Sequence, residues 1–143
     1  MMNKKLLTIM LVIIGSITLI GVTALVVVTK FVGNEDEHKE PSIEEVVEAS
    51  VDIPEITTNL SSGNIVRISF KIETDSKKAK EELTQRSFQA QDIVISELAN
   101  LDAAQLEGTE GMNKLKESIS NRINALMQEG KVKKIYTTSY ILQ

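Results

Sequence analysis

The stretch Ile65-Val-Arg-Ile-Ser-Phe-Lys-Ile72 alternates apolar and polar side chains with the period of a β-strand. Successive side chains of a strand point to opposite faces of the sheet. One face would carry Val66, Ile68, Phe70 and Ile72, and the other Arg67, Ser69 and Lys71. The pattern predicts a strand with one face toward a core and one face toward water.

A second strand is predicted just before this one. Val51-Asp-Ile-Pro-Glu-Ile56 has extended character, and Pro54 confines such a strand to a sheet edge or to two short pieces. The segment 59–64, Asn-Leu-Ser-Ser-Gly-Asn, is typical of a turn. The two strands are therefore expected to form a hairpin.

Two amphipathic helices are predicted after the hairpin. Asp75 or Ser76 is the expected N-cap of a first helix of about 24 residues. A single turn follows at Asp102, then a loop with Gly108 and Gly111, and then a second helix over 112–128. Helical spacing places Ala79, Leu83, Ala90, Val94 and Leu98 on the apolar face of the first helix, and Met112, Leu115, Ile119, Ile123 and Leu126 on that of the second.

A closing strand is predicted over 131–142, after Gly130 ends the second helix as its C′ residue. Its β-branched and aromatic residues suit pairing back onto the hairpin. Tyr136 and Tyr140 lie four residues apart, so a regular strand would place them on one face, as a contact patch or in sheet packing. The predicted fold class is α+β, with the order β-β-α-α-β in a small domain over 51–143.

An apolar segment without charges, Leu6 to Val28, precedes the domain. As a helix it would be roughly 34 Å long, enough to cross a hydrocarbon core of about 30 Å. A signal peptide cleaved after Ala24 is the alternative, but the apolar run continues past that point and favours an uncleaved transmembrane helix over 6–29. The short tail at 1–5 favours a cytoplasmic N-terminus and an extracytoplasmic domain. Small residues at Gly15, Thr18 and Gly21 are candidate contacts with a second helix.

The residues between the span and the domain, 30–50, are expected to form an acidic, flexible linker. Between Asn34 and Glu55 the chain has nine acidic residues and one lysine. His38 is expected to be a solvated linker residue. Ile43, Val46 and Val47 would line one face of a short helix if this segment docks against a partner.

The composition excludes several classes of chemistry. The 143-residue chain has no cysteine and one histidine, so it lacks the residues for a disulfide framework, a thiolate nucleophile or a histidine-rich metal centre. Neither GxGxxG nor GxxxxGK[ST] occurs. The domain has no basic field for nucleic acid. The carboxylate pairs Glu81–Glu82 and Glu107–Glu110 lie in hydrophilic surroundings, so catalytic residues, cofactors and metals are not expected.

Three C-terminal segments resemble the FliL family of flagellar basal-body-associated membrane proteins. They are Gly111-Met-Asn-Lys-Leu-Lys-Glu-Ser-Ile119, Arg122-Ile-Asn-Ala-Leu126 and the stretch from Gly130 to Gln143. The Asn59-Leu60 pair, the hairpin strand and the one-pass N-terminal anchor fit that family as well.

The resemblance implies a fold similar to the stomatin-type domain and a non-enzymatic role at the flagellar basal body. Proteins of this family associate with the ion-conducting stator units and are thought to form rings around them. A homo-oligomer in the cytoplasmic membrane is therefore expected, with roles in stator engagement, torque, flagellar rotation, motility and chemotaxis. The expected partners are the stator, the basal body and the lipid bilayer, and not nucleic acid.

Two other functions remain open from the residues alone. One is an extracytoplasmic sensor or small-ligand-binding module, which an apolar pocket with converging polar groups would favour. The other is an anchored hydrolase. A self-complementary flank of the domain would instead favour the ring.

Overall fold

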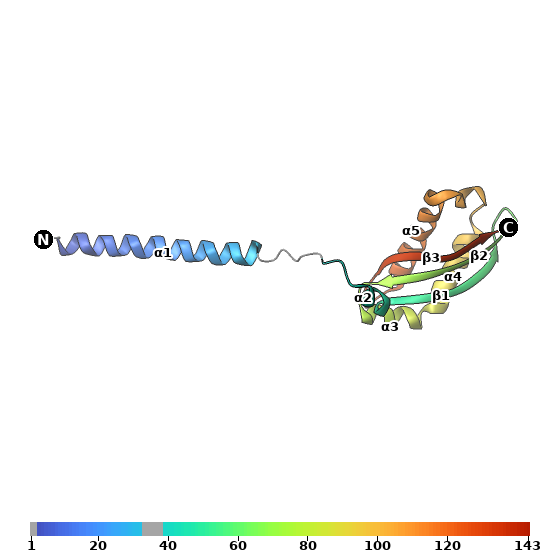
Figure 1. Cartoon of the computed structure of the whole chain (residues 1–143), viewed down its shortest axis with the longest axis horizontal. Coiled ribbons are helices and arrows are strands. Elements are labelled where there is room, and N and C mark those ends of the chain that lie inside the picture. Colours follow the sequence, from blue (N-terminus) through green and yellow to red (C-terminus); the bar gives the residue numbers. More distant parts are fainter. Residues whose placement is uncertain (1–2, 33–38) are drawn as a thin grey trace. The chain divides into compact units, whose positions relative to one another are not determined.

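The computed structural model describes residues 3–32 and 39–143, and it divides into two compact units, one ending at Glu40 and the other spanning Pro41–Gln143. The first unit contains helix α1 (Lys4–Val32). The α-helices and β-strands of the second unit are labelled in Figure 1. The elements of this unit are α2 (Ile43–Glu48), β1 (Ser50–Asn59), β2 (Ile65–Thr74), α3 (Lys77–Gln85), α4 (Ser87–Ala99), the 3₁₀ turn η1 (Ala104–Leu106), α5 (Gly108–Leu126) and β3 (Val132–Leu142).

Helix α1 has the length and composition of a membrane span. Its stretch Lys4–Lys30 reaches a mean hydropathy of 2.7, and large apolar side chains such as Leu19 and Ile20 are exposed. The hydroxyl of Thr18 donates to the Ile14 carbonyl at 2.7 Å, and that of Thr23 to the Leu19 carbonyl at 2.7 Å. Such bonds satisfy the polar side chains within the helix, as a hydrocarbon environment requires. The predicted helix over 6–29 is confirmed as helical.

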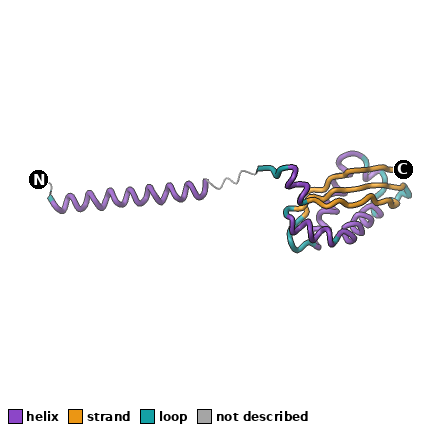
Figure 2. The backbone as a smooth tube through the Cα atoms, turned by 60° about the horizontal axis from the view of Figure 1, so that its bottom comes forward, coloured by secondary structure: helices purple, strands orange, loops and turns teal. Residues whose placement is uncertain are grey.

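The domain is α+β, as predicted, with one antiparallel sheet in the order β1-β2-β3. The three strands lie side by side in Figure 2. Strand β1 is an edge strand, and its register with β2 is interrupted between Ile53 and Ile56, around Pro54. Proline lacks the N–H that a regular ladder needs, which explains this bulge. The last strand pairs with β2, so the expected pairing of the closing strand with the hairpin is confirmed.

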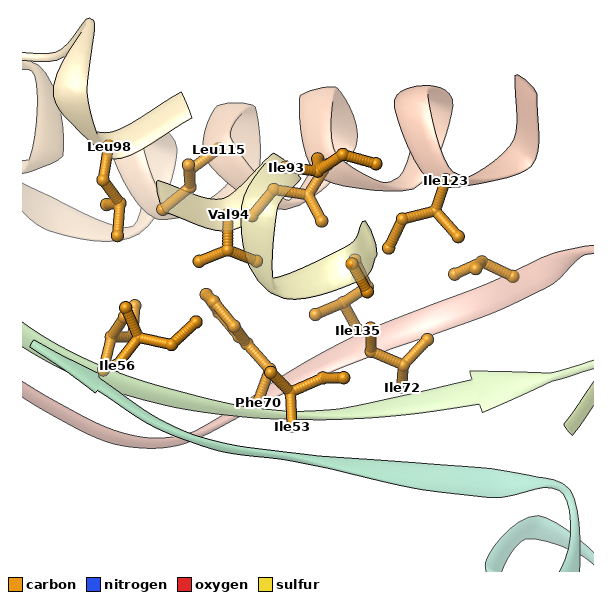
Figure 3. Packing of buried hydrophobic residues seen from close by; sticks show 14 of the residues in the cluster. Ile53, Ile56, Phe70, Ile72, Ile93, Val94, Leu98, Leu115, Ile123 and Ile135 are labelled. Atoms are coloured by element: carbon orange, nitrogen blue, oxygen red, sulfur yellow. The ribbon is translucent and has the colours of Figure 1, made fainter. Parts of the chain in front are cut away.

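The core lies between one face of the sheet and the helices. Figure 3 shows Ile53, Phe70 and Ile72 pointing from the strands toward Val94 and Ile123 of the helices. The four predicted core residues of β2 are at most 1% exposed. Arg67 remains exposed, while Ser69 and Lys71 are half-buried. The alternation in β2 was therefore predicted correctly.

The first predicted helix is two helices. Ser76 is its N-cap and accepts a hydrogen bond from the Ala79 N–H, as expected, but the helix breaks at Arg86. At 100° per residue, Leu98 would lie about 100° around a straight helix from Ala79. Both residues are fully buried. The break at Arg86 allows both helical segments to face the sheet.

The second predicted helix begins and ends earlier than expected. Helix α5 runs from Gly108 to Leu126, and its C-cap, Met127, is extended. Gly130 is therefore not the C′ residue of the helix. Of the predicted stripe, Leu115, Ile119 and Ile123 are buried and Met112 packs partly against the core. Leu126, by contrast, is 37% exposed.

Gly130 is needed for a different reason. Its φ is 151°, which side-chain-bearing residues rarely adopt, and a Cβ there would collide with the Asp75 carboxylate and the Ala79 Cβ. The Asp75 N–H donates to the Lys131 carbonyl at 3.0 Å. The glycine thus lets the segment before β3 pass close to the start of α3.

Residues 41–50 of the predicted linker belong to the domain unit and include helix α2. Helix α2 has a complete capping box, in which Ser42 and Glu45 exchange hydrogen bonds. The Thr74 N–H and hydroxyl both donate to the Ala49 carbonyl, at 2.9 and 2.6 Å. Residues from Pro41 onward belong to the domain unit, so its boundary lies ten residues before the predicted 51. His38 falls outside the described residues.

Candidate interaction surfaces

The carboxylate pairs singled out in the sequence do not form a catalytic arrangement. Glu82 accepts hydrogen bonds from the backbone N–H groups of Gln128 and Glu129 and from Arg86 Nε, at 2.7 to 3.0 Å. The Glu129 N–H bond is the main cause that lowers the pKa of Glu82 below 4.5. These contacts give Glu82 a structural role, because they hold the segment after α5 against α3.

The pair Glu107–Glu110 lies at the exposed start of α5. Glu110 forms an ion pair with Lys114 at 3.2 Å, and both side chains are more than 70% exposed. Such a pair is solvated and provides no contrasting environments for an acid and a base. Among residues 3–32 and 39–143, no three His, Asp or Glu side chains are grouped so as to hold a metal ion.

A cleft of about 450 Å³ lies between the end of α4 and the start of α5, and Glu97, Glu107 and Glu110 are among the residues that line it. Its carboxylate Glu97 accepts from the Ser118 hydroxyl at 2.7 Å and from Arg122 Nη1 at 2.8 Å. The Ser118 bond is the main cause that lowers the pKa of Glu97. The carboxylate therefore fastens α4 to α5 and is not directed at a ligand.

The structure places Gly15, Thr18 and Gly21 along α1. A Cβ added at either glycine would meet no atom within 4 Å, so both positions are open. All side chains of residues 3–30 are exposed. The three residues remain candidates for contact with a second helix.

Helix α2 carries three apolar residues that are candidate partner contacts, and two of them are exposed. Ile43 is 73% exposed and Val47 is 51% exposed, one turn apart, while Val46 is half-buried. Val46 lines a cleft of about 360 Å³ together with Glu73 and Lys133. The apolar side chains of α2 thus lie on one face, as the sequence indicated, and two of them are exposed.

Tyr136 and Tyr140 do not share a face, contrary to the prediction. Strand β3 has a bulge: Ser139 lies opposite Ser69, but the next pair is Thr137 with Phe70, so Thr138 is an extra residue. Tyr140 lies opposite the buried Ile68 and Tyr136 opposite Lys71. Residues four apart share a face only in a regular strand. The bulge at Thr138 therefore places these two tyrosines on opposite faces of the sheet.

Tyr136 belongs to a polar cluster on the outer face of the sheet. Its hydroxyl donates to Glu73 Oε2 at 2.9 Å, which raises the pKa of the phenol. Glu73 is only 4% exposed and has Lys133 Nζ at 3.6 Å. Lys134 Nζ lies 5.0 Å from the centre of the Tyr136 ring. The sequence did not indicate this cluster, because it depends on strand register and on α2.

Other polar side chains of the outer face pair across strands. Lys71 contacts Asp52 at 3.1 Å, and Arg67 contacts Glu55 at 3.5 Å. The hydroxyls of Ser69 and Thr138 lie 3.1 Å apart. This face suits contact with a polar protein surface.

Residues 50–143 match the family model described as flagellar basal body-associated protein FliL. A flagellar protein FliL of Bacillus subtilis (strain 168) is 51% identical over 110 residues, which cover 77% of this chain and 79% of that protein. A flagellar protein FliL of Aquifex aeolicus (strain VF5) is 26% identical over 77 residues, covering 54% of this chain and 48% of that protein.

Proposed function

Because the chain belongs to the FliL family of flagellar basal body-associated proteins, we propose that it is a non-enzymatic accessory of the flagellar motor. In this role it associates with the stator units, self-associates as a ring around them, and supports stator engagement, torque and motility. The observation that carries the proposal is the family match across the sheet and helices of the domain, residues 50–143.

The arrangement of the chain supports this role. Helix α1 provides an anchor in the cytoplasmic membrane, with the N-terminus inside and the domain outside. The domain exposes apolar side chains on α2, Ile43 and Val47, and a polar sheet face. Such surfaces suit protein partners close to the bilayer, whereas Glu97, in the cleft between α4 and α5, is already engaged by Ser118 and Arg122.

A deletion strain complemented with chain variants tests the proposal. We expect the deletion to reduce swimming speed and the number of labelled stator units at each motor, and we expect the wild-type chain to restore both. A chain that retains residues 1–40 but lacks Pro41–Gln143 should restore neither, because the proposed contacts lie in the domain.

A matched control carries an exposed substitution, Asn113→Ala, on the outer side of α5. It should complement as well as the wild type. Normal swimming and stator recruitment in the deletion strain would leave the proposal without support.

A further inference from the structure

Helix α2 presents one side to solvent and is fixed to the sheet by its end. Its C-cap residue, Ala49, accepts two hydrogen bonds from Thr74. At about 100° per residue, four exposed residues of the helix share an arc of roughly 140°. They are Ile43, Val47, Glu44 and Glu48. This solvent side, called the α2 face below, thus combines two apolar side chains with two carboxylates.

The negative charge of the α2 face is not balanced within the domain. Nine acidic residues and one lysine lie between Asn34 and Glu55. Among the described residues, Glu44 has no ion pair, and Glu48 pairs with Lys77 at 3.2 Å through side chains that are both more than half exposed. An exposed pair of this kind contributes little, so Glu48 can exchange Lys77 for a cation from a partner.

A cleft of about 360 Å³ lies next to this face, between α2 and the end of the sheet. Four carboxylates and two lysines are among its lining residues: Glu45, Glu48, Glu73, Asp75, Lys77 and Lys133. Glu73 is only 4% exposed, and the Tyr136 hydroxyl donates to its Oε2 at 2.9 Å. Its Oε1 has Lys133 Nζ at 3.6 Å, which is too long for a hydrogen bond. A cation that enters this cleft therefore meets an excess of carboxylates.

Charge complementarity selects the occupant of the α2 face. A lipid surface would set Glu44 and Glu48 against headgroup phosphates, and a second α2 face would set them against their own copies. Both contacts bring like charges together, which is unfavourable. A segment that carries lysine or arginine beside apolar residues matches both parts of the face, because its cations pair with the carboxylates and its apolar side chains cover Ile43 and Val47.

We propose that the α2 face and its cleft dock an extracytoplasmic segment of the stator in which lysine or arginine stands beside apolar residues. The cationic side chain enters the cleft, and the apolar side chains cover Ile43 and Val47. The capping box of α2 forms within the chain itself, so this surface is preformed and no helix has to fold on binding. The inference rests on the stator association proposed above, and it adds the surface and the chemistry of the docked segment.

Site-specific photo-crosslinking in cells tests this docking. The full chain carries Val47→benzoylphenylalanine in a deletion strain whose stator subunits have an epitope tag. We expect position 47 to crosslink to a stator subunit at least about tenfold more than position 113, because a docked face excludes water and other molecules. Asn113 is the matched control, since it is exposed on α5. The crosslinked stator peptide, identified by mass spectrometry, should contain lysine or arginine beside apolar residues.

The other occupants are separate outcomes of this experiment. Suppose that the motors recruit stators, but position 47 crosslinks to a second copy of this chain, to lipid or to nothing. That result would overturn the docking and leave the proposed function standing. A crosslinked stator peptide without a cation would overturn the inferred chemistry of the segment. Normal stator recruitment in the deletion strain itself would remove the proposed function, and the docking with it.

Charge reversal gives a second measurement that needs no crosslinker. Glu44→Lys places a cation on the α2 face, whereas Glu110→Lys places one on α5. Both glutamates are exposed in the first turn of a helix, so the effect on helix stability is matched. At equal abundance of the chain, Glu44→Lys should lower the number of labelled stator units at each motor at least about threefold, and Glu110→Lys should not. Equal recruitment by Glu44→Lys and the wild type would overturn the cationic occupant.

Discussion

At the scale of single residues, Glu82 joins the break between α3 and α4 to the segment after α5, 46 residues further along the chain. Its carboxylate accepts from two backbone N–H groups after α5 and from Arg86 at the break between α3 and α4. We expect Glu82→Gln to lower the midpoint of thermal unfolding at pH 7, because the neutral amide cannot accept these bonds as strongly. Glu81→Gln, at the exposed neighbouring position, should leave it unchanged.

The sign of the pH effect follows from the lowered pKa of Glu82. A group whose pKa is lower in the folded chain contributes stability above its unfolded pKa, near 4.5, and loses it as the pH falls through the folded value. The difference between wild type and Glu82→Gln should therefore be full at pH 7 and should shrink below about pH 4.5. A difference that is the same at pH 7 and pH 3 would contradict an ionic role for this carboxylate.

Gly130 is the second residue whose replacement should destabilise the whole domain. At a φ of 151°, and with Asp75 and Ala79 against the position of a Cβ, Gly130→Ala should destabilise the fold by about 1–3 kcal/mol. Denaturant unfolding of the full chain in detergent measures this. Gly63→Asn is the matched control, because Gly63 has a φ of 85° and open space around it, and asparagine tolerates that conformation. Equal loss in both variants would show that backbone strain alone, and not the contact with α3, is responsible.

At the scale of elements, the burial of β2 defines the fold. Ile68 is fully buried, so Ile68→Asp should cost several kcal/mol, close to the total stability of a small domain. Arg67→Ala, next to it on the exposed face, should cost on the order of 0.5 kcal/mol. Circular dichroism melts of the two variants check this. A folded Ile68→Asp domain would mean that the two faces of β2 are assigned wrongly.

The elements also show which features sequence patterns predict. The strand β2 and the apolar faces of α4 and α5 follow from regular periodicity, because one buried face imposes one repeat. The break at Arg86 and the bulge at Thr138 depend on how distant elements pack, and no local residue marks them. Helix α2 was expected only if its segment docks against a partner, because carboxylates surround it; the structure shows that its capping box forms within the chain itself.

For the candidate contact residues too, the sequence predicted what depends on local spacing and not what depends on strand register. Ile43 and Val47 lie exposed on one side of α2, as their spacing indicated. Tyr136 and Tyr140 lie on opposite faces, because their shared face required a strand without a bulge. Glu73 was not singled out, since its burial depends on the register of three strands.

At the scale of the whole molecule, the chain is expected to cross the membrane once. A reporter that is active only outside the cytoplasm should be active when fused after Gln143, because α1 is long and apolar enough to span the bilayer and, in the proposed topology, its N-terminal end lies in the cytoplasm. The same reporter fused after Lys5 should be inactive. The reverse result would place the domain in the cytoplasm and would rule out the proposed topology.

The late position of β3 in the chain has a consequence for biogenesis. Strands β1 and β2 are neighbours in sequence, but β3 follows only after α3, α4 and α5. A two-stranded hairpin is marginal in water, so a nascent chain that ends before Val132 lacks a stable sheet. Contacts between segments distant in sequence also form slowly. The domain therefore reaches its native state only after β3 has been synthesised and, in the proposed topology, exported, which makes folding a post-translational event on the far side of the membrane.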